Sequence, residues 1–218
     1  TEEVAQILAI CHEMDQPVVP HGGLTGLVDA TQSNQYELAL SLERMNAIED
    51  IDVQSRTMTV QAGVPLQTVQ EKADEAGMLF PLDLGARGTA TIGGNVSTNA
   101  GGNRVIRYGM MRDQVLGMEV VLADGTIISS MNKILKNNTG YDLKQLFIGS
   151  EGTLGVVTRL VLRMRPLPVS QEMALLAIDD FTKVTEFLNH IDSALGGTLS
   201  AYEVLWQDYY QLVTKPPA

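Results

Sequence analysis

The chain has 218 residues, and its 26 Asp and Glu outnumber its 15 Lys and Arg, which gives a formal net charge of −11. This acidic balance argues against nonspecific binding to nucleic acid or to an anionic membrane. The single cysteine, Cys11, excludes an intrachain disulfide framework and a multi-cysteine zinc site. It is compatible with a reducing compartment, and we expect a cytoplasmic protein.

Membrane and export signals are also missing from the sequence. No apolar run approaches the roughly 20 residues that cross a bilayer. The chain opens on Thr1-Glu2-Glu3, whereas a signal peptide would carry basic residues there. We therefore expect no transmembrane segment, and the first residues are not expected to be a signal peptide.

The first half of the chain alternates short helical and strand patterns. Apolar residues at helical spacing predict helices, and alternating apolar residues predict strands. Pro65 suits the start of a helix, and Gly77 suits its end. The expected elements are a helix over 1–14, strands at 18–20, 38–42 and 57–61, and a helix over 66–76.

From about residue 81 to residue 112 the sequence shows no regular period, and no helix or strand is expected there. Asp124-Gly125 between two apolar segments then predicts a hairpin. The strands of this hairpin should cover 115–122 and 126–130. A short helical turn at 143–147 precedes a long strand at 154–164, which Pro166 and Pro168 close.

The composition and the spacing of apolar residues change after residue 168. The pattern predicts a strand at 172–178, a helix at 181–195 and a strand at 198–205, which is half of a ferredoxin-like unit. We therefore expect an α+β chain with one domain at 1–168, whose N-terminal edge lies outside the chain, and the truncated beginning of a second domain at 169–218. Half a unit leaves an unpaired sheet edge, which predicts self-association.

The first of three glycine-bearing segments covers residues 20–27. Its Gly-Gly-Leu-Thr-Gly sequence exposes several backbone N–H groups around one point, and no Cβ blocks a ligand. Such a nest of amides binds anions, typically phosphate. The Thr25 hydroxyl adds a donor. A plain loop with a tight turn is the alternative.

The second segment covers residues 81–103 and contains six glycines between positions 85 and 102. Its small side chains let the main chain approach a large flat ligand, and its Asn and Thr side chains supply donors and acceptors. The alternative is an idle surface loop, but a long loop inside a compact domain is more often functional.

The third segment covers residues 149–155, between the short helical turn and the last long strand. Glu151 can accept hydrogen bonds from a ribose hydroxyl or from backbone amides, and a capped turn is the alternative. Together, the three segments suit a dinucleotide with a fused ring system. They supply a nest of amides for an anion, a loop that can hold a flat ring, and a polar group near the start of a strand.

Other catalytic signatures are absent. The sequence has neither a Walker-type phosphate loop nor the Gly-x-Gly-x-x-Gly fingerprint. The three histidines (His12, His21 and His190) lie in unrelated contexts, so no metal site is expected on this chain.

Long ordered runs make the chain resemble a known family. It is similar to the FAD-binding (PCMH-type) domain of vanillyl-alcohol-oxidase-like flavoproteins, in the branch of D-2-hydroxyglutarate, D-lactate and glycolate dehydrogenases. The resemblance covers residues 1–168 well and the remainder more loosely. The runs that carry it are 20–27, 81–102, 107–109, 116–125 and 138–155.

The resemblance implies a two-part FAD-binding domain followed by the start of a ferredoxin-like substrate (cap) domain. It places the FAD pyrophosphate on the first segment, the flavin ring and phosphates on the second, and the adenosine half on the third. Some relatives attach flavin through a histidine, but Thr25 stands there, so noncovalent FAD is expected. The implied cofactor-binding residues are Gly22, Gly23, Leu24, Thr25, Gly26, Pro81, Leu82, Gly85, Thr91, Gly93, Gly94, Asn95, Thr98, Asn99, Gly101, Gly102, Glu151, Gly152 and Val156.

The implied reaction is oxidation of a D-2-hydroxy acid, of the 2-hydroxyglutarate, lactate or glycolate type, to the 2-oxo acid, with hydride passed to flavin N5. In such proteins the substrate-binding cations and any divalent metal come from the domain after the flavin domain. No catalytic residue is therefore assigned here, and the fragment alone is expected to be inactive. The implied partners are a hydroxy-acid substrate and an electron acceptor such as electron-transfer flavoprotein or quinone, and a homodimer is compatible with the sequence.

Two other functions stay open. A noncatalytic FAD-binding subunit would fit the absence of substrate residues. Another flavin oxidoreductase of the same superfamily, such as a sugar-nucleotide reductase that uses NADPH, would fit the glycine-rich segments. Arg107 is either part of a wall beside the flavin or a member of a surface ion pair.

Overall fold

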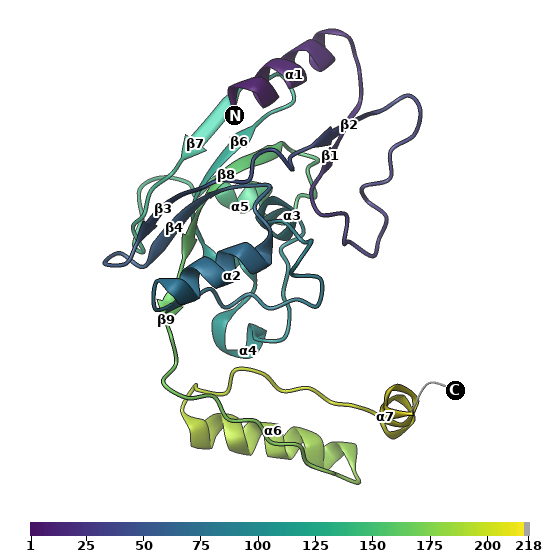
Figure 1. The fold of residues 1–218 in the computed structure, drawn as a ribbon, viewed down its shortest axis with the longest axis vertical. Helices are drawn as coiled ribbons and strands as arrows, with labels where there is room; N and C mark the ends of the chain where they lie inside the picture. The colour runs from purple at the N-terminus through teal and green to yellow at the C-terminus, as the bar shows by residue number, and fades with distance from the viewer. Residues whose placement is uncertain (216–218) are drawn as a thin grey trace.

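The computed structural model describes residues 1–215 and is built around one antiparallel sheet (Figure 1). The order of its strands is β3-β4-β8-β6-β7, so strands far apart in sequence are neighbours. The bounds are Ile48–Asp52 for β3, Thr57–Gln61 for β4, Val115–Val121 for β6, Ile127–Ser130 for β7 and Val156–Arg163 for β8. The strands expected at 57–61 and 154–164 are confirmed. Strand β3 was not predicted, because its acidic Glu49 and Asp50 obscure the alternating pattern.

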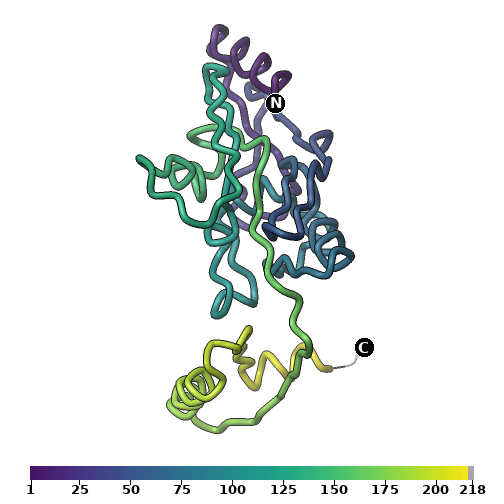
Figure 2. The backbone as a smooth tube through the Cα atoms, turned by 90° about the vertical axis from the view of Figure 1, so that its left-hand side faces the viewer, coloured from purple at the N-terminus to yellow at the C-terminus, as the bar shows by residue number. Residues whose placement is uncertain are grey.

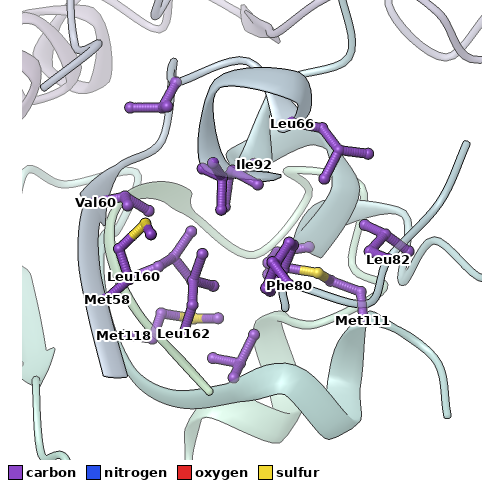
Figure 3. Close-up of a cluster of buried hydrophobic side chains, with 14 of the residues drawn as sticks. Met58, Val60, Leu66, Phe80, Leu82, Ile92, Met111, Met118, Leu160 and Leu162 are labelled. Carbon is purple, nitrogen blue, oxygen red and sulfur yellow. The ribbon is translucent and has the colours of Figure 1, made fainter. Parts of the chain in front are cut away.

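The main hydrophobic core lies between the sheet and helix α2 (Leu66–Glu75) (Figure 3). Strands β4 and β8 contribute Met58, Val60, Leu160 and Leu162, all of them fully buried. Helix α2 begins directly after Pro65, and its apolar side chains face this core. The expectation of a helix over 66–76 is confirmed.

A smaller core joins helix α1 (Glu2–Glu13) to the upper end of the sheet in Figure 1. Val4 and Leu8 of α1 pack there with Val121 and Val156. Next to it, β1 (Val18–His21) and β2 (Leu38–Ser41) form a separate two-stranded parallel sheet. The predictions of this helix and these two strands are confirmed, and the end of β1 delivers the first glycine-bearing segment.

The region from 81 to 112 contains short helices, so the prediction that it has no regular structure was wrong. Helix α3 (Ile92–Ser97) buries Ile92 and Val96 one turn apart, but Gly93 and Gly94 hide its helical pattern in the sequence. Helix α4 (Val105–Tyr108) and the 3-10 helix η1 (Met111–Gln114) follow. Before this region, β5 (Met78–Leu79) pairs with β9 (Arg165–Pro166) at the far end of β8.

The predicted hairpin is confirmed, with β6 and β7 antiparallel around a turn at Gly125 (φ +84°). The carboxylate of Asp124 accepts a hydrogen bond from the backbone N–H of Thr126 (2.9 Å). This bond holds the pKa of Asp124 below its ordinary value. The expected short helix is also present as α5 (Lys144–Phe147).

Asp124 gives a prediction about pH. Because its pKa is lower in the folded chain, the carboxylate stabilises the fold above the unfolded pKa of about 4, and this contribution is lost as the pH falls through the folded pKa. We expect Asp124→Ala to lower the urea midpoint at pH 7, and its difference from wild type to shrink below about pH 4. Urea denaturation at pH 7, 5 and 3.5 measures this, and a difference independent of pH would contradict it.

Residues 169–215 form a small helical part below the sheet-containing part (Figure 2). The predicted helix is confirmed as α6 (Phe181–Leu195), which is capped by Asp180 and ends at Gly196 (φ +56°). Helix α7 (Gln207–Thr214) was not predicted, because its Tyr-Tyr and Leu-Val pairs also fit a strand. Within 1–215, no helix has both the length and the apolar character needed to cross a membrane.

The strands predicted at 172–178 and 198–205 are wrong, because neither segment is assigned as a strand. A strand needs a hydrogen-bonding neighbour, and the described residues supply none for these two segments. Instead Tyr202 donates its hydroxyl to the carbonyl of Val184 (2.8 Å), and Phe181 stacks on Trp206 with ring centroids 5.7 Å apart. The argument for self-association through an unpaired sheet edge therefore fails.

Candidate cofactor-binding site

The first glycine-bearing segment leaves β1 and runs directly against the second. A Cβ built on Gly22 would lie 2.6 Å from the Thr91 hydroxyl oxygen and 3.6 Å from the Gly94 Cα. A Cβ on Gly23 would overlap the carbonyl oxygen of Thr89 and lie 2.7 Å from its carbonyl carbon. The contact therefore requires glycine at position 23.

The second segment is folded back on itself. Residues Asp83 and Gly102 form an isolated β-bridge, which joins its beginning to its end. Gly102 has φ +77°, and a Cβ there would lie 2.9 Å from the carbonyl carbon of Asp83. The N–H of Gly93 donates to the carbonyl of Ala62 (2.7 Å), which fixes α3 to the end of β4. The result is a closed loop around a short helix.

The third segment contacts both of the others. The backbone N–H of Glu151 donates to the carbonyl of Ser97 (2.8 Å), and that of Gly149 donates to the carbonyl of Val96 (3.1 Å). A Cβ on Gly152 would lie 3.1 Å from the Cγ of Pro20, next to the first segment. The three segments therefore converge, and we call the surface that they share the cradle.

The predicted residues differ in how far they are accessible in the cradle. Val156 points into the smaller core, which leaves its backbone as the part that can meet a ligand. The exposed residues are Leu24, Thr25, Gly26, Gly85, Thr98, Gly102 and Glu151. The half-buried residues are Gly22, Gly23, Gly94, Asn99, Gly101 and Gly152. The buried residues are Pro81, Leu82, Thr91, Gly93, Asn95 and Val156.

Unpartnered polar atoms lie at the cradle. Buried polar atoms without a hydrogen bond cost about 1–3 kcal/mol each. His21 Nε2, Thr91 Oγ1 and Asn95 Nδ2 are such atoms, and all three belong to or adjoin the first two segments. A ligand with phosphate oxygens and a polar ring edge would give them partners, so the residues present fit a flavin dinucleotide.

Two arginines near the cradle bind backbone carbonyls. Arg107 stacks over the Tyr108 ring (5.1 Å to the centroid) and donates to the carbonyl of Thr198 (3.3 Å). Within 1–215 it forms no ion pair, which removes one of the two alternatives for Arg107. Arg112 was missed by the sequence reasoning, because the carbonyls that it binds are 33 and 36 residues further along the chain. No local pattern signals such a contact.

No cluster of three His, Cys, Asp or Glu side chains that could hold a metal occurs among residues 1–215.

Leu24 has an unusual backbone conformation, with φ +53° and an exposed side chain. A bulky residue in the left-handed region costs roughly 1–2 kcal/mol, whereas Asn tolerates it. We expect Leu24→Asn to raise the free energy of unfolding by about 0.5–1 kcal/mol in urea. Leu27→Asn is the control, because Leu27 is also exposed but has no positive φ, and it should change little. Equal effects of the two would contradict the assignment of strain to Leu24.

The fold and the cradle define a class of protein: a mixed α/β domain whose glycine-rich backbone fits a dinucleotide cofactor. Comparison with known families gives the same class, because the FAD binding domain family matches residues 1–130. The chain belongs to this family.

Individual relatives are similar over most or nearly all of the chain. D-2-hydroxyglutarate dehydrogenase, mitochondrial, of Bos taurus is 46% identical and matches 98% of this chain and 39% of the relative. The protein of the same name from Danio rerio is 45% identical and matches 99% and 40%. D-2-hydroxyglutarate dehydrogenase of Xanthomonas citri pv. viticola is 46% identical and matches 83% and 38%. The chain thus spans about two fifths of the length of these relatives.

A solved structure of alkyldihydroxyacetonephosphate synthase has the same fold. The TM-score is 0.69 at 24% identity, over 78% of this chain and 31% of that one. This similarity supports the fold alone, and the expected α+β fold class is confirmed.

Proposed function

We propose that the chain binds FAD noncovalently in the cradle and forms the FAD-binding part of a flavin-linked D-2-hydroxy-acid dehydrogenase. The observation that carries this proposal is the convergence of three glycine-bearing segments around the unpartnered polar atoms of His21, Thr91 and Asn95. The names of the relatives supply the reaction class.

Each segment has its own role in this proposal. The amides of the first segment bind the pyrophosphate, because nests of backbone N–H groups attract anions. The second segment faces the flavin ring and the phosphates, with Asn95 and Thr91 as polar contacts. The third segment meets the adenosine half through Glu151, Gly152 and the backbone of Val156.

The cradle would hold FAD, which would supply a hydride acceptor at flavin N5 for the C2–H of the hydroxy acid. This chain holds and orients the cofactor. We propose that the groups that bind the substrate carboxylate and remove the hydroxyl proton, and any divalent metal, lie in the part of the relatives beyond this chain. Residues 1–168 are then the FAD-binding domain, and residues 169–218 begin the substrate domain.

Noncovalent attachment rests on Thr25, which offers a hydroxyl where a covalent link would need a histidine. The test is to denature the purified protein and pass it through a desalting membrane. We expect all of the yellow flavin to pass into the filtrate. The mass spectrum of the retained protein should show the unmodified mass. A protein mass increased by a flavin would overturn noncovalent binding.

The cofactor itself is tested by an absorbance scan from about 300 to 550 nm, before and after FAD is added. A two-band flavin spectrum that saturates on titration supports the proposal. The absence of any change would overturn FAD binding by this chain. Reduction of the bound flavin by NADPH would instead favour the sugar-nucleotide reductase type. A flavin in the longer protein that neither NADPH nor a D-2-hydroxy acid reduces would favour a noncatalytic subunit.

The partners and the compartment are further proposals. We propose a D-2-hydroxy acid as substrate and electron-transfer flavoprotein or quinone as acceptor, with a homodimer to be tested by light scattering. The bovine and zebrafish relatives are named mitochondrial, whereas the Xanthomonas relative is not. We propose the cytoplasm for this chain, and cell fractionation decides between the two compartments.

A further inference from the structure

Arg112 joins two of the three segments that form the cradle. Its guanidinium donates to the backbone carbonyls of Ile148 (2.7 Å) and Gln145 (3.2 Å), and also to the side-chain oxygen of Gln145. Its own backbone N–H donates to Oδ1 of Asn99 (3.0 Å). One residue therefore holds the end of α5, from which the third segment starts, and also the second segment.

The two segments meet in a short seam directly beside this guanidinium. The seam consists of the hydrogen bonds from the N–H groups of Gly149 and Glu151 to the carbonyls of Val96 and Ser97. A Cβ built on Gly149 would lie 3.8 Å from Nη2 of Arg112. Gly149 has φ +83° and Glu151 has φ +53°, so the backbone on this side of the seam is held in a conformation that side chains disfavour.

The charge of Arg112 is not neutralised by the residues around it. Its side chain bonds neutral oxygens of Gln145 and Ile148, and within 1–215 no carboxylate forms an ion pair with it. A half-buried positive charge therefore lies at the seam, where it favours an anionic ligand.

We propose that Arg112 is a positioning residue for FAD: it fixes the seam between the second and third segments and supplies positive charge toward the anionic cofactor. The inference rests on the proposed FAD site. It requires arginine, because the planar fork reaches two carbonyls at once, whereas a lysine ammonium on a flexible stem does not hold both in one geometry.

The test compares Arg112→Gln and Arg112→Lys with wild type by hydrogen exchange without FAD and by FAD titration. In Arg112→Gln we expect the amides of Gly149 and Glu151 to exchange at least about 10-fold faster, and the Kd for FAD to rise roughly 10- to 100-fold. In Arg112→Lys the exchange should be equally fast, with a smaller rise in Kd because the charge is kept. Full rescue of both readouts by lysine would overturn the positioning role.

Arg159 provides the matched control, because it is also a half-buried arginine with several hydrogen bonds. Its partners are Glu49 and Glu119, away from the cradle. Arg159→Gln should lower the melting temperature but leave the exchange of Gly149 and Glu151 and the Kd unchanged. Equal losses of FAD affinity in the two glutamine variants would overturn the inference. If wild type takes up no FAD, the proposed function fails, and the exchange experiment still decides whether Arg112 holds the seam.

Discussion

The substitution Gly23→Ala is expected to weaken flavin binding strongly. The added Cβ would overlap the carbonyl oxygen of Thr89 and lie 2.9 Å from the Cα of Ala90, and both neighbours are backbone atoms. Backbone cannot yield as the end of a flexible side chain does, so the first segment must move away from the second. We expect the Kd for FAD to rise at least about 100-fold, which corresponds to roughly 2.7 kcal/mol. FAD titration followed by absorbance measures this.

Gly88→Ala is the control for this variant. Gly88 lies in the same glycine-rich tract, but a Cβ there would approach only the Oε1 of Gln67, at 3.3 Å. The exposed Gln67 side chain donates its Nε2–H to Glu71 (2.8 Å), and its end can shift by a few tenths of an ångström, as backbone cannot. Flavin binding should therefore be kept. The circular dichroism spectra of the two variants should match wild type, which separates a local loss of the cradle from unfolding. Wild-type affinity in Gly23→Ala would mean that the first segment does not shape the site.

The sequence alone predicted the three glycine-bearing segments of the cradle better than the hydrogen bonds that join these segments. Glycines at 22, 23, 93 and 102 are informative because a Cβ at each would lie less than 3 Å from an atom of another residue. A need for glycine can be recognised in the sequence, since the glycines themselves are written there. The partners of Arg112 are not visible in this way. They are carbonyls, which every residue has, and only the folded chain brings Ile148 beside Arg112.

The same distinction explains the errors at the end of the chain. The apolar residues of 172–178 and 198–205 fit a strand, but a strand forms only where a neighbour offers hydrogen bonds, and local sequence does not specify that neighbour. Helix α6 was predicted correctly because its bonds are internal and its ends are marked by Asp180 and Gly196.

Removal of the Phe80 side chain is expected to cause the largest loss of stability. Phe80 is 1% exposed and lies in the main core, close to Met111 and Leu82 (Figure 3). Phe→Ala in such a core leaves a cavity and costs about 3–5 kcal/mol. For a chain of this size each kcal/mol corresponds to about 2–4 °C, so we expect the melting temperature to fall by roughly 6–20 °C. Thermal unfolding followed by circular dichroism measures this.

Phe181→Ala makes the same chemical change at an exposed position, since Phe181 is 57% exposed on α6, and it should cost far less. Equal losses in the two variants would contradict the assignment of the core. Stabilisation by FAD gives a second readout for Phe80→Ala, because a ligand that binds only the folded state raises the melting temperature by mass action.

The contacts of Gly23 and Thr91 that shape the cradle do not involve Phe80. Phe80→Ala should therefore keep most of the stabilisation by FAD while losing stability without it. Loss of both together would mean that the core and the cradle form one cooperative unit.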